Sequence, residues 1–117
     1  MNKVRLIYYT TRSGRSVVED ALLSFSSAQQ DKIQRAIRPI VEFGIGVHLR
    51  NTRKLSGTPL WEIRILGKDN IRIIYAVVIK DSVMLLHIFS KKSQKTPTKD
   101  LDLALQRYTD ARQRLTS

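Results

Sequence analysis

The stretch "LWEIRIL", residues 60–66, carries an acidic and a basic side chain, Glu62 and Arg64, at alternating positions of an apolar run. In a β-strand these two side chains share one face, so we expect that face to be open and the apolar face to enter the core. The next apolar run holds Arg72 between two isoleucines, where a guanidinium needs an anion or solvent to offset its desolvation. Glu62 can supply that anion. A cross-strand ion-pair set on a solvated face fits the same three residues equally well.

Lysines collect where the last apolar run ends, in "SKKSQK". Lys91, Lys92 and Lys95 can reach the sheet end that bears the two arginines, and together these cations would surround a site of phosphate size. A charge run at a strand exit can also keep a protein soluble without binding anything, and that alternative remains.

Other chemistries have little support in the residue types present. The chain has no cysteine, and His48 and His87 are too far apart in sequence to suggest a pair of metal ligands, so we expect neither a metal nor a cofactor. We expect His87 to be a hydrogen-bonded strand residue and His48 a loop residue, and assign neither a catalytic role. Trp61 and Tyr75 can stack on nucleobases, although core packing explains their strand spacing more readily.

The charge balance points to a negatively charged partner. Lys and Arg number 21 against 10 Asp and Glu, which gives a formal net charge of +11 and a pI near 10.5. Such a chain favours nucleic acid first, and an anionic membrane or an acidic protein second. A length of 117 residues with 42% hydrophobic content predicts one domain, residues 1–117. Because no window approaches the roughly 18 apolar residues of a membrane span, we expect a cytoplasmic protein that does not enter membranes.

Hydrophobic spacing predicts a strand and then two helices in the N-terminal part. The strand "VRLIYYT", residues 4–10, is rich in β-branched and aromatic residues and precedes the loop-like "TRSG". Helical spacing then runs from Ser16 to Phe25 and, after "SS", along a second helix until Gly44. Pro39 lies inside the second pattern, where it removes one backbone hydrogen bond, so we expect a kink or an early break there.

Alternating hydrophobicity then predicts three strands, at residues 60–66, 71–79 and 83–89. The linkers "GKDN" and "KDS" have hairpin length, so we expect an antiparallel meander with the middle strand in the centre. A final helix should have Thr96 as its N-cap and Pro97 as its first helical residue. Its apolar stripe would consist of Leu101, Ala104, Leu105, Tyr108 and Leu115.

The stretch from "KLSGTPLWEIRI" through "NIRIIYAVVIKDSVMLLHIFSKKSQKTPTKDLDLALQRYTD" resembles the HigB-like toxins of the RelE/ParE superfamily. The element "F-x-K-K-x-x-K-T-P", followed by an acidic helix with Ala and Leu, is typical of the HigB-like branch, whereas "L-W-E-x-R" and "x-R-x-x-Y" are shared more widely. The resemblance covers most of the chain. It implies an α+β fold with two N-terminal helices packed on a mainly antiparallel sheet, and a C-terminal helix.

The resemblance also implies a toxin of a type II toxin–antitoxin pair that cleaves mRNA in the ribosome without a metal and is neutralised by a helix-turn-helix, HigA-like antitoxin. By motif, Arg72 takes the position of the phosphate-clamping arginine, Arg64 a basic position on the preceding strand, and Lys92 the position near the leaving oxygen. Some members of the superfamily have a tyrosine or histidine at the position after "SKK", where it stacks or transfers protons, but this chain has neither there. Lys95 and Glu62 are therefore the candidates for proton transfer. We further expect RNA contacts from Lys54, Lys68, Tyr75, Lys91 and Lys99.

A second reading belongs to a different class of protein. On the ParE side of the superfamily, the same scaffold inhibits a protein such as gyrase without cleaving RNA. Convergence of Arg64, Arg72 and Lys92 would favour the nuclease, because a non-cleaving binder does not need it. A catalytically dead relative remains a third reading.

Overall fold

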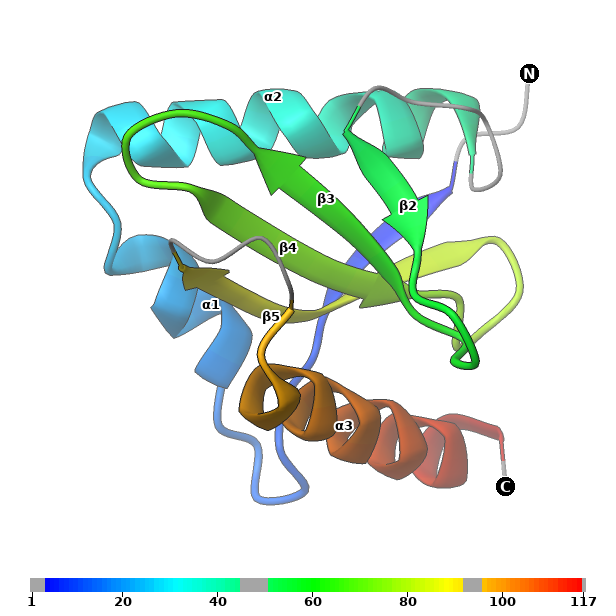
Figure 1. Cartoon of the computed structure of the whole chain (residues 1–117). Helices are drawn as coiled ribbons and strands as arrows, with labels where there is room; N and C mark the ends of the chain where they lie inside the picture. Colours follow the sequence, from blue (N-terminus) through cyan, green and yellow to red (C-terminus); the bar gives the residue numbers. More distant parts are fainter. Residues whose placement is uncertain (1–3, 45–50, 92–95, 117) are drawn as a thin grey trace.

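A computed structural model describes residues 4–44, 51–91 and 96–116, which form a five-stranded sheet flanked by three helices (Figure 1). The strands lie in the order β1-β5-β4-β3-β2. Their bounds are β1 Arg5–Tyr8, β2 Thr52–Lys54, β3 Trp61–Ile65, β4 Ile71–Ala76 and β5 Ser82–Ser90.

Strands β3, β4 and β5 form the predicted antiparallel meander, and β4 is its middle strand. All six residues of β4 are buried, because neighbouring strands pair with both of its edges and other elements cover both of its faces. Strand β1 pairs with β5 in the parallel direction and forms one edge of the sheet. The opposite edge is β2, a strand that the sequence does not predict because its three residues, "TRK", have no apolar alternation.

Helix α1 (Val17–Leu23) and helix α2 (Ser27–Phe43) follow β1 as predicted. The start of α2 is a capping box, in which the side chains of Ser26 and Gln29 each bond the other residue's backbone N–H. The helix runs without interruption through Pro39 to its end, so the expected early break is wrong. Buried isoleucines lie on both sides of the proline, and their packing outweighs the loss of one backbone hydrogen bond.

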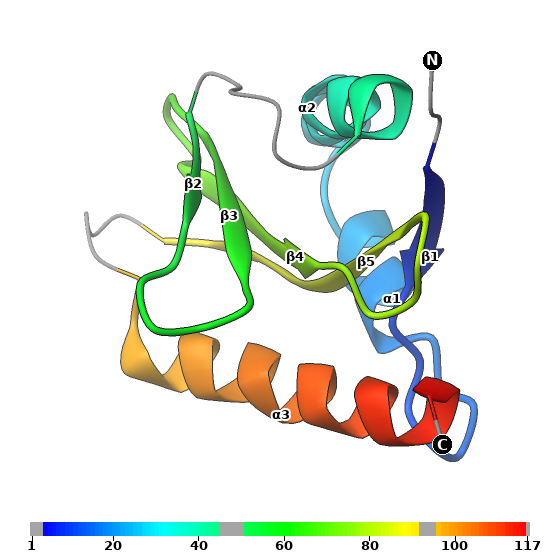
Figure 2. The same ribbon diagram turned by 90° about the vertical axis from the view of Figure 1, so that its right-hand side faces the viewer.

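Helix α3 (Thr98–Thr116) lies on the opposite side of the sheet from α2 (Figure 2). It begins after Pro97, whose carbonyl accepts from the Leu101 N–H at 3.0 Å, and not at Pro97 as predicted. Most of the predicted stripe packs against the core, but Leu115 is 45% exposed. Ala111, seven residues after Ala104 and fully buried, lies on the packed face instead.

The α+β fold with two N-terminal helices, a mainly antiparallel sheet and a C-terminal helix is confirmed. The core is a single cluster of buried apolar side chains contributed by the sheet and all three helices. In the described part of the chain, no helix has both the length and the apolar character needed to cross a membrane.

Candidate functional site

Glu62 lies at the centre of a group of arginines on one face of the sheet. Antiparallel pairing sets Arg53 of β2 opposite Glu62, and Arg72 of β4 opposite Arg64. Since Arg64 is two residues from Glu62 on β3, all four side chains project from the same face. Glu62 Oε1 is 3.1 Å from Arg64 Nε and 3.4 Å from Arg53 Nε, and Glu62 Oε2 is 4.0 Å from Arg72 Nη1.

A hydroxyl completes the coordination of this carboxylate. Thr96, in the segment that leads into α3, donates from Oγ1 to Glu62 Oε2 at 2.5 Å. The residue predicted to cap α3 thus bonds a carboxylate on the sheet, and α3 itself begins two residues later, at Thr98. We call Arg53, Glu62, Arg64, Arg72 and Thr96 the Glu62 cluster.

The expectation that the charged face of β3 is open is wrong. Glu62 is fully buried and Arg72 is 1% exposed, since α3 covers this side of the sheet (Figure 2) and Thr96, just before α3, bonds Glu62. Exposure then rises toward the edge strand, from 19% for the Arg64 side chain to 53% for that of Arg53. The cluster thus has a buried floor and a solvent-facing rim.

The Glu62 cluster is electrostatically unbalanced, with three guanidinium groups around one carboxylate. Burial lowers the pKa of Arg72, and the charge of Glu62 acts against that decrease. Arg64 and Arg53 lower the pKa of Arg72 further because they repel its positive charge. An arginine retains its proton under such conditions, so the arrangement presents fixed positive charge in a poorly solvated place. A phosphate group is the natural ligand for such a charge.

His87 and Asp100 form a second polar pair on the same side of the sheet. His87 Nε2 lies 2.7 Å from Asp100 Oδ1 in the first turn of α3, and the His87 ring stacks on Phe89 at a centroid distance of 4.7 Å. Burial lowers the pKa of His87 although the bond to Asp100 acts to raise it. A lowered pKa favours the neutral imidazole, in which form the contact with Asp100 is a hydrogen bond. This confirms the prediction of a hydrogen-bonded strand histidine.

The lysines predicted to bind RNA fall in two groups. Lys68, in the turn between β3 and β4, and Lys91, at the end of β5, are exposed at the sheet end nearest Arg64 and Arg72, where the Lys91 N–H bonds the Asn70 carbonyl at 3.1 Å. Two other exposed lysines, Lys54 and Lys99, lie farther from this end. Lys54 is opposite Trp61, so its side chain leaves the sheet on the other face, and Lys99 is in the first turn of α3.

Tyr75 was predicted to contact RNA, and its burial contradicts this. The residue is 2% exposed and pairs with Trp61, on the face opposite Glu62. Burial also raises the pKa of its hydroxyl. A base cannot stack on a ring that no solvent reaches. Lys92 and Lys95, the two predicted catalytic lysines, lie outside the described residues, as does His48.

Three participants escaped the sequence analysis. Arg53 was missed together with β2, although the turn-like "SGTP" between "TRKL" and "WEIRI" is a hairpin signal that would have set it opposite Glu62. Thr96 was predicted to cap the last helix, and Asp100 was given no role. No local sequence pattern reveals the partners of Thr96 and Asp100, because each bond joins the start of α3 to a strand of the sheet.

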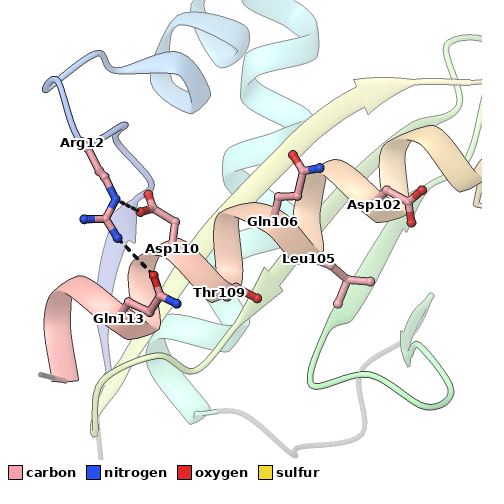
Figure 3. A pocket seen from close by; sticks show the side chains of 7 residues that line it. All are labelled: Arg12, Asp102, Leu105, Gln106, Thr109, Asp110 and Gln113. Atoms are coloured by element: carbon pink, nitrogen blue, oxygen red, sulfur yellow. Dashed lines mark hydrogen bonds and ion pairs between the residues drawn. The ribbon is translucent and has the colours of Figure 1, made fainter.

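A hollow of about 550 Å³ lies away from these groups, beside the exposed stripe of α3 and the loop after β1 (Figure 3). There Asp110 Oδ1 is 2.6 Å from Arg12 Nε, and Asp110 Oδ2 accepts from Tyr9 at 2.5 Å and from Arg114 at 2.8 Å. We call Tyr9, Arg12, Asp110 and Arg114 the Asp110 cluster. The hydroxyl of Tyr9 is the main cause of a lowered pKa at Asp110, and Arg114 adds to it. None of the residues that line this hollow belongs to the Glu62 cluster, so the hollow is separate from the candidate site.

Within the described residues there is no group of three or more His, Asp or Glu side chains that could hold a metal ion. Comparison with curated proteins gives no match. A family model described as phage-derived protein Gp49-like (DUF891) matches residues 20–109. That range includes the Glu62 cluster, both central hairpins and most of α3. Because the match spans well over half of the chain, the protein belongs to this phage-derived Gp49-like family, which is part of the RelE/ParE-like toxin superfamily and is of the toxin–antitoxin type.

Proposed function

We propose that this protein is the HigB-like toxin of a type II toxin–antitoxin pair and arrests translation by cleaving mRNA in the ribosome. The observation that carries the proposal is the Glu62 cluster, in which three arginines converge on one buried carboxylate at a sheet face that opens toward an edge strand. The net charge of +11 supports an RNA partner. Membership of the Gp49-like family supports a protein of the toxin–antitoxin type. The nuclease activity is our proposal.

The proposed reaction needs positive charge more than it needs a special nucleophile. The ribose 2′-hydroxyl attacks the adjacent phosphorus, the bond to the 5′-oxygen breaks, and the products are a 2′,3′-cyclic phosphate and a 5′-hydroxyl. Negative charge grows on the phosphate oxygens in the transition state, and preorganised donors stabilise it there. Arg64 and Arg53, on the rim, are the arginines that a phosphate reaches from solvent.

The burial of Arg72 changes its proposed role. In this conformation the guanidinium lies behind the rim at 1% exposure, so it contributes charge from below the phosphate and does not grip it as a clamp. Glu62 is equally inaccessible and holds Arg53 and Arg64 in place, which makes it a positioning residue. Lys92 and Lys95 stay proposed for the leaving oxygen and for proton transfer, and Lys68 and Lys91 for backbone phosphates of the message.

We expect the partner proteins to follow from this activity. A cognate helix-turn-helix antitoxin of the HigA type, encoded beside the gene, would keep the toxin inactive in the cytoplasm, and the ribosome would present the mRNA. A strongly cationic domain gives an acidic antitoxin segment a fast, electrostatically steered approach.

The burial of Arg72 is also what favours a second candidate. If the Glu62 cluster serves only to bury charge within the fold, the protein would act as a ParE-like inhibitor of a protein such as gyrase and would cleave nothing. The two candidates differ in whether messages are cut.

The test compares the two charged clusters in cells. The wild type, Arg64→Ala, Arg64→Lys and the matched control Arg12→Ala are expressed from a tight promoter, with and without the neighbouring open reading frame, while growth is followed and mRNA 5′ ends are mapped. We expect arrest and in-frame cuts for the wild type and Arg12→Ala, and a loss of about 10²- to 10³-fold in cutting for Arg64→Ala, as for other lost oxyanion donors. Lysine at position 64 should restore part of it, because it keeps the charge and loses the planar fork.

The outcomes separate the candidates. Arrest without cuts would establish the non-cleaving inhibitor. If both Arg64 variants arrest growth as strongly as the wild type, the Glu62 cluster is not the active site. If the wild-type protein does not slow growth even at high expression, so that the neighbouring open reading frame has no arrest to relieve, the assignment of this chain as a toxin would be overturned.

A further inference from the structure

His87 shares a sheet face and a cross-strand row with Glu62. Ile74 of β4 is paired with Glu62 on one side and with His87 on the other, so the two polar side chains flank it. Arg72 is opposite Phe89, two residues from His87 along β5, which makes His87 a diagonal neighbour of Arg72. Diagonal neighbours in a sheet lie about 7–8 Å apart, within reach of long side chains. The imidazole therefore projects from the same face of the sheet as the arginines.

Asp100 determines which nitrogen of His87 carries the proton. Its carboxylate accepts at 2.7 Å from Nε2, so the hydrogen lies on Nε2 and the lone pair on Nδ1. Among the described residues, Nδ1 has no hydrogen-bond partner, and the side chain keeps 14% of its surface exposed. Stacking on Phe89, with 19° between the ring planes, fixes the orientation of the ring. A free lone pair on an oriented imidazole is what a general base needs.

The surroundings keep the imidazole neutral and ready to accept a proton. Burial lowers the pKa of His87 against the effect of Asp100, and two cations on α3, Arg107 and Lys99, act in the same direction as burial. Arg72, its diagonal neighbour on β4, is a further cation on the same face of the sheet. Glu62 is less suited to the task, because it is fully buried and its two oxygens already contact arginines and Thr96.

We infer that His87, oriented by Asp100, is the general base of RNA cleavage, an inference that rests on the proposed nuclease function. Nδ1 accepts the proton of the ribose 2′-hydroxyl as its oxygen bonds to phosphorus. The bond from phosphorus to the 5′-oxygen breaks, and that oxygen takes a proton from water or from a cationic side chain. The cyclic phosphate and the 5′-hydroxyl leave, and the imidazolium returns its proton to solvent. No oxidant, metal or further reactant is required.

The test uses the full chain on programmed ribosomes under single-turnover conditions, from about pH 5 to about pH 9. For the wild type we expect a rate that rises with pH up to a plateau whose midpoint lies below the ordinary histidine pKa of about 6.5. His87→Gln can still donate an amide N–H to Asp100 but cannot take a proton, so we expect a rate lower by about 10²- to 10⁴-fold without that rise. Message binding should stay within about twofold, since an uncharged group is exchanged for an uncharged group.

Two more measurements keep the inference falsifiable if His87→Gln folds poorly. Asp100→Asn should slow cleavage less than His87→Gln does and should shift the midpoint of the pH profile. The imidazole can still accept a proton in this variant, but it loses the anion that orients it. Nitrogen chemical shifts of the wild-type imidazole should show a neutral ring with hydrogen on Nε2. A charged ring at neutral pH, or hydrogen on Nδ1, would overturn the inference without any variant.

The two levels of the proposal fail differently. A wild type that binds programmed ribosomes but cuts nothing overturns the nuclease function and the base together. If His87→Gln cuts at the wild-type rate and with the wild-type pH profile, only the general-base role of His87 is overturned. The hydrogen bond between His87 and Asp100 would then have a structural role, holding β5 and α3 together.

Discussion

The two charged clusters at opposite ends of α3 have similar contents and very different surroundings. In each, a carboxylate accepts from a hydroxyl and contacts more than one arginine, and at least one of these arginines comes from another part of the chain. Glu62 bonds Thr96, just before α3, and is fully buried on the sheet. Asp110, in the C-terminal half of α3, bonds Tyr9 and contacts Arg12, whose side chain is 61% exposed. The first cluster holds its carboxylate and Arg72 out of water, whereas the carboxylate and both arginines of the second keep part of their surface exposed.

This difference teaches what burial adds to the same chemistry. Around Asp110 water screens the charges, so the cluster acts as a fastening between α3 and the segment after β1. Around Glu62 the lower effective dielectric strengthens every interaction and makes each partner costly to remove. Charge preorganised in this way is suited to stabilising a transition state, whereas the contacts of the Asp110 cluster link α3 to the segment after β1.

The largest difference should appear when each carboxylate becomes an amide. Glu62→Gln leaves Arg72 buried without its nearest anion, so we expect a loss of about 3–5 kcal/mol in unfolding free energy. Asp110→Asn should cost clearly less, because its arginines can turn to water. Urea denaturation of both variants under the same conditions measures this. Equal losses would show that burial does not distinguish the clusters, and a stable Glu62→Gln would contradict the account of the buried floor.

An intermediate difference concerns RNA binding. Removal of the rim cation in Arg53→Ala should reduce the slope of log K against log salt by about 0.7, the value for one phosphate of a single strand. Lys91→Ala should have an effect of the same size or smaller, and Arg12→Ala should leave the slope unchanged. Titration of a labelled single-stranded RNA at several salt concentrations gives the slopes. If Arg12→Ala changes the slope as much as Arg53→Ala, RNA does not prefer the Glu62 side of the molecule.

The smallest effects should appear in the pH dependence of stability. The lowered pKa of Asp110 means that its contribution is complete above the ordinary value of about 4 and is lost as the pH falls through the lowered value. The lowered pKa of His87 means that the unfolded chain binds a proton first, so stability declines as the pH falls below about 6.5.

Urea midpoints measured between about pH 3 and pH 8 should separate these two windows. Tyr9→Phe removes the hydroxyl that most lowers the pKa of Asp110, so it should weaken only the decline at low pH. His87→Gln should remove only the decline that begins below about pH 6.5. A single decline that neither substitution alters would mean that other groups dominate acid unfolding.

Local patterns in the sequence were sufficient to determine most of the architecture. Alternation with short polar linkers predicted the meander, because a two-residue period and a hairpin turn are properties of adjacent residues. The same alternation correctly grouped Glu62 with Arg64 on one face, and the net charge followed from composition alone. Where a feature depends on a few neighbouring residues, the sequence by itself determined it.

Only the tertiary structure decided what covers that face and which partners meet there. Thr96 is 34 positions from Glu62, and its hydroxyl bonds the sheet because the fold brings it beside a buried carboxylate. Arg53 joins the cluster through β2, a strand with no apolar pattern of its own, and its backbone is ordered by pairing with β3. Burial results from elements that return from far along the chain, so α3 turned an apparently open charged face into a dry site with a solvent-facing rim.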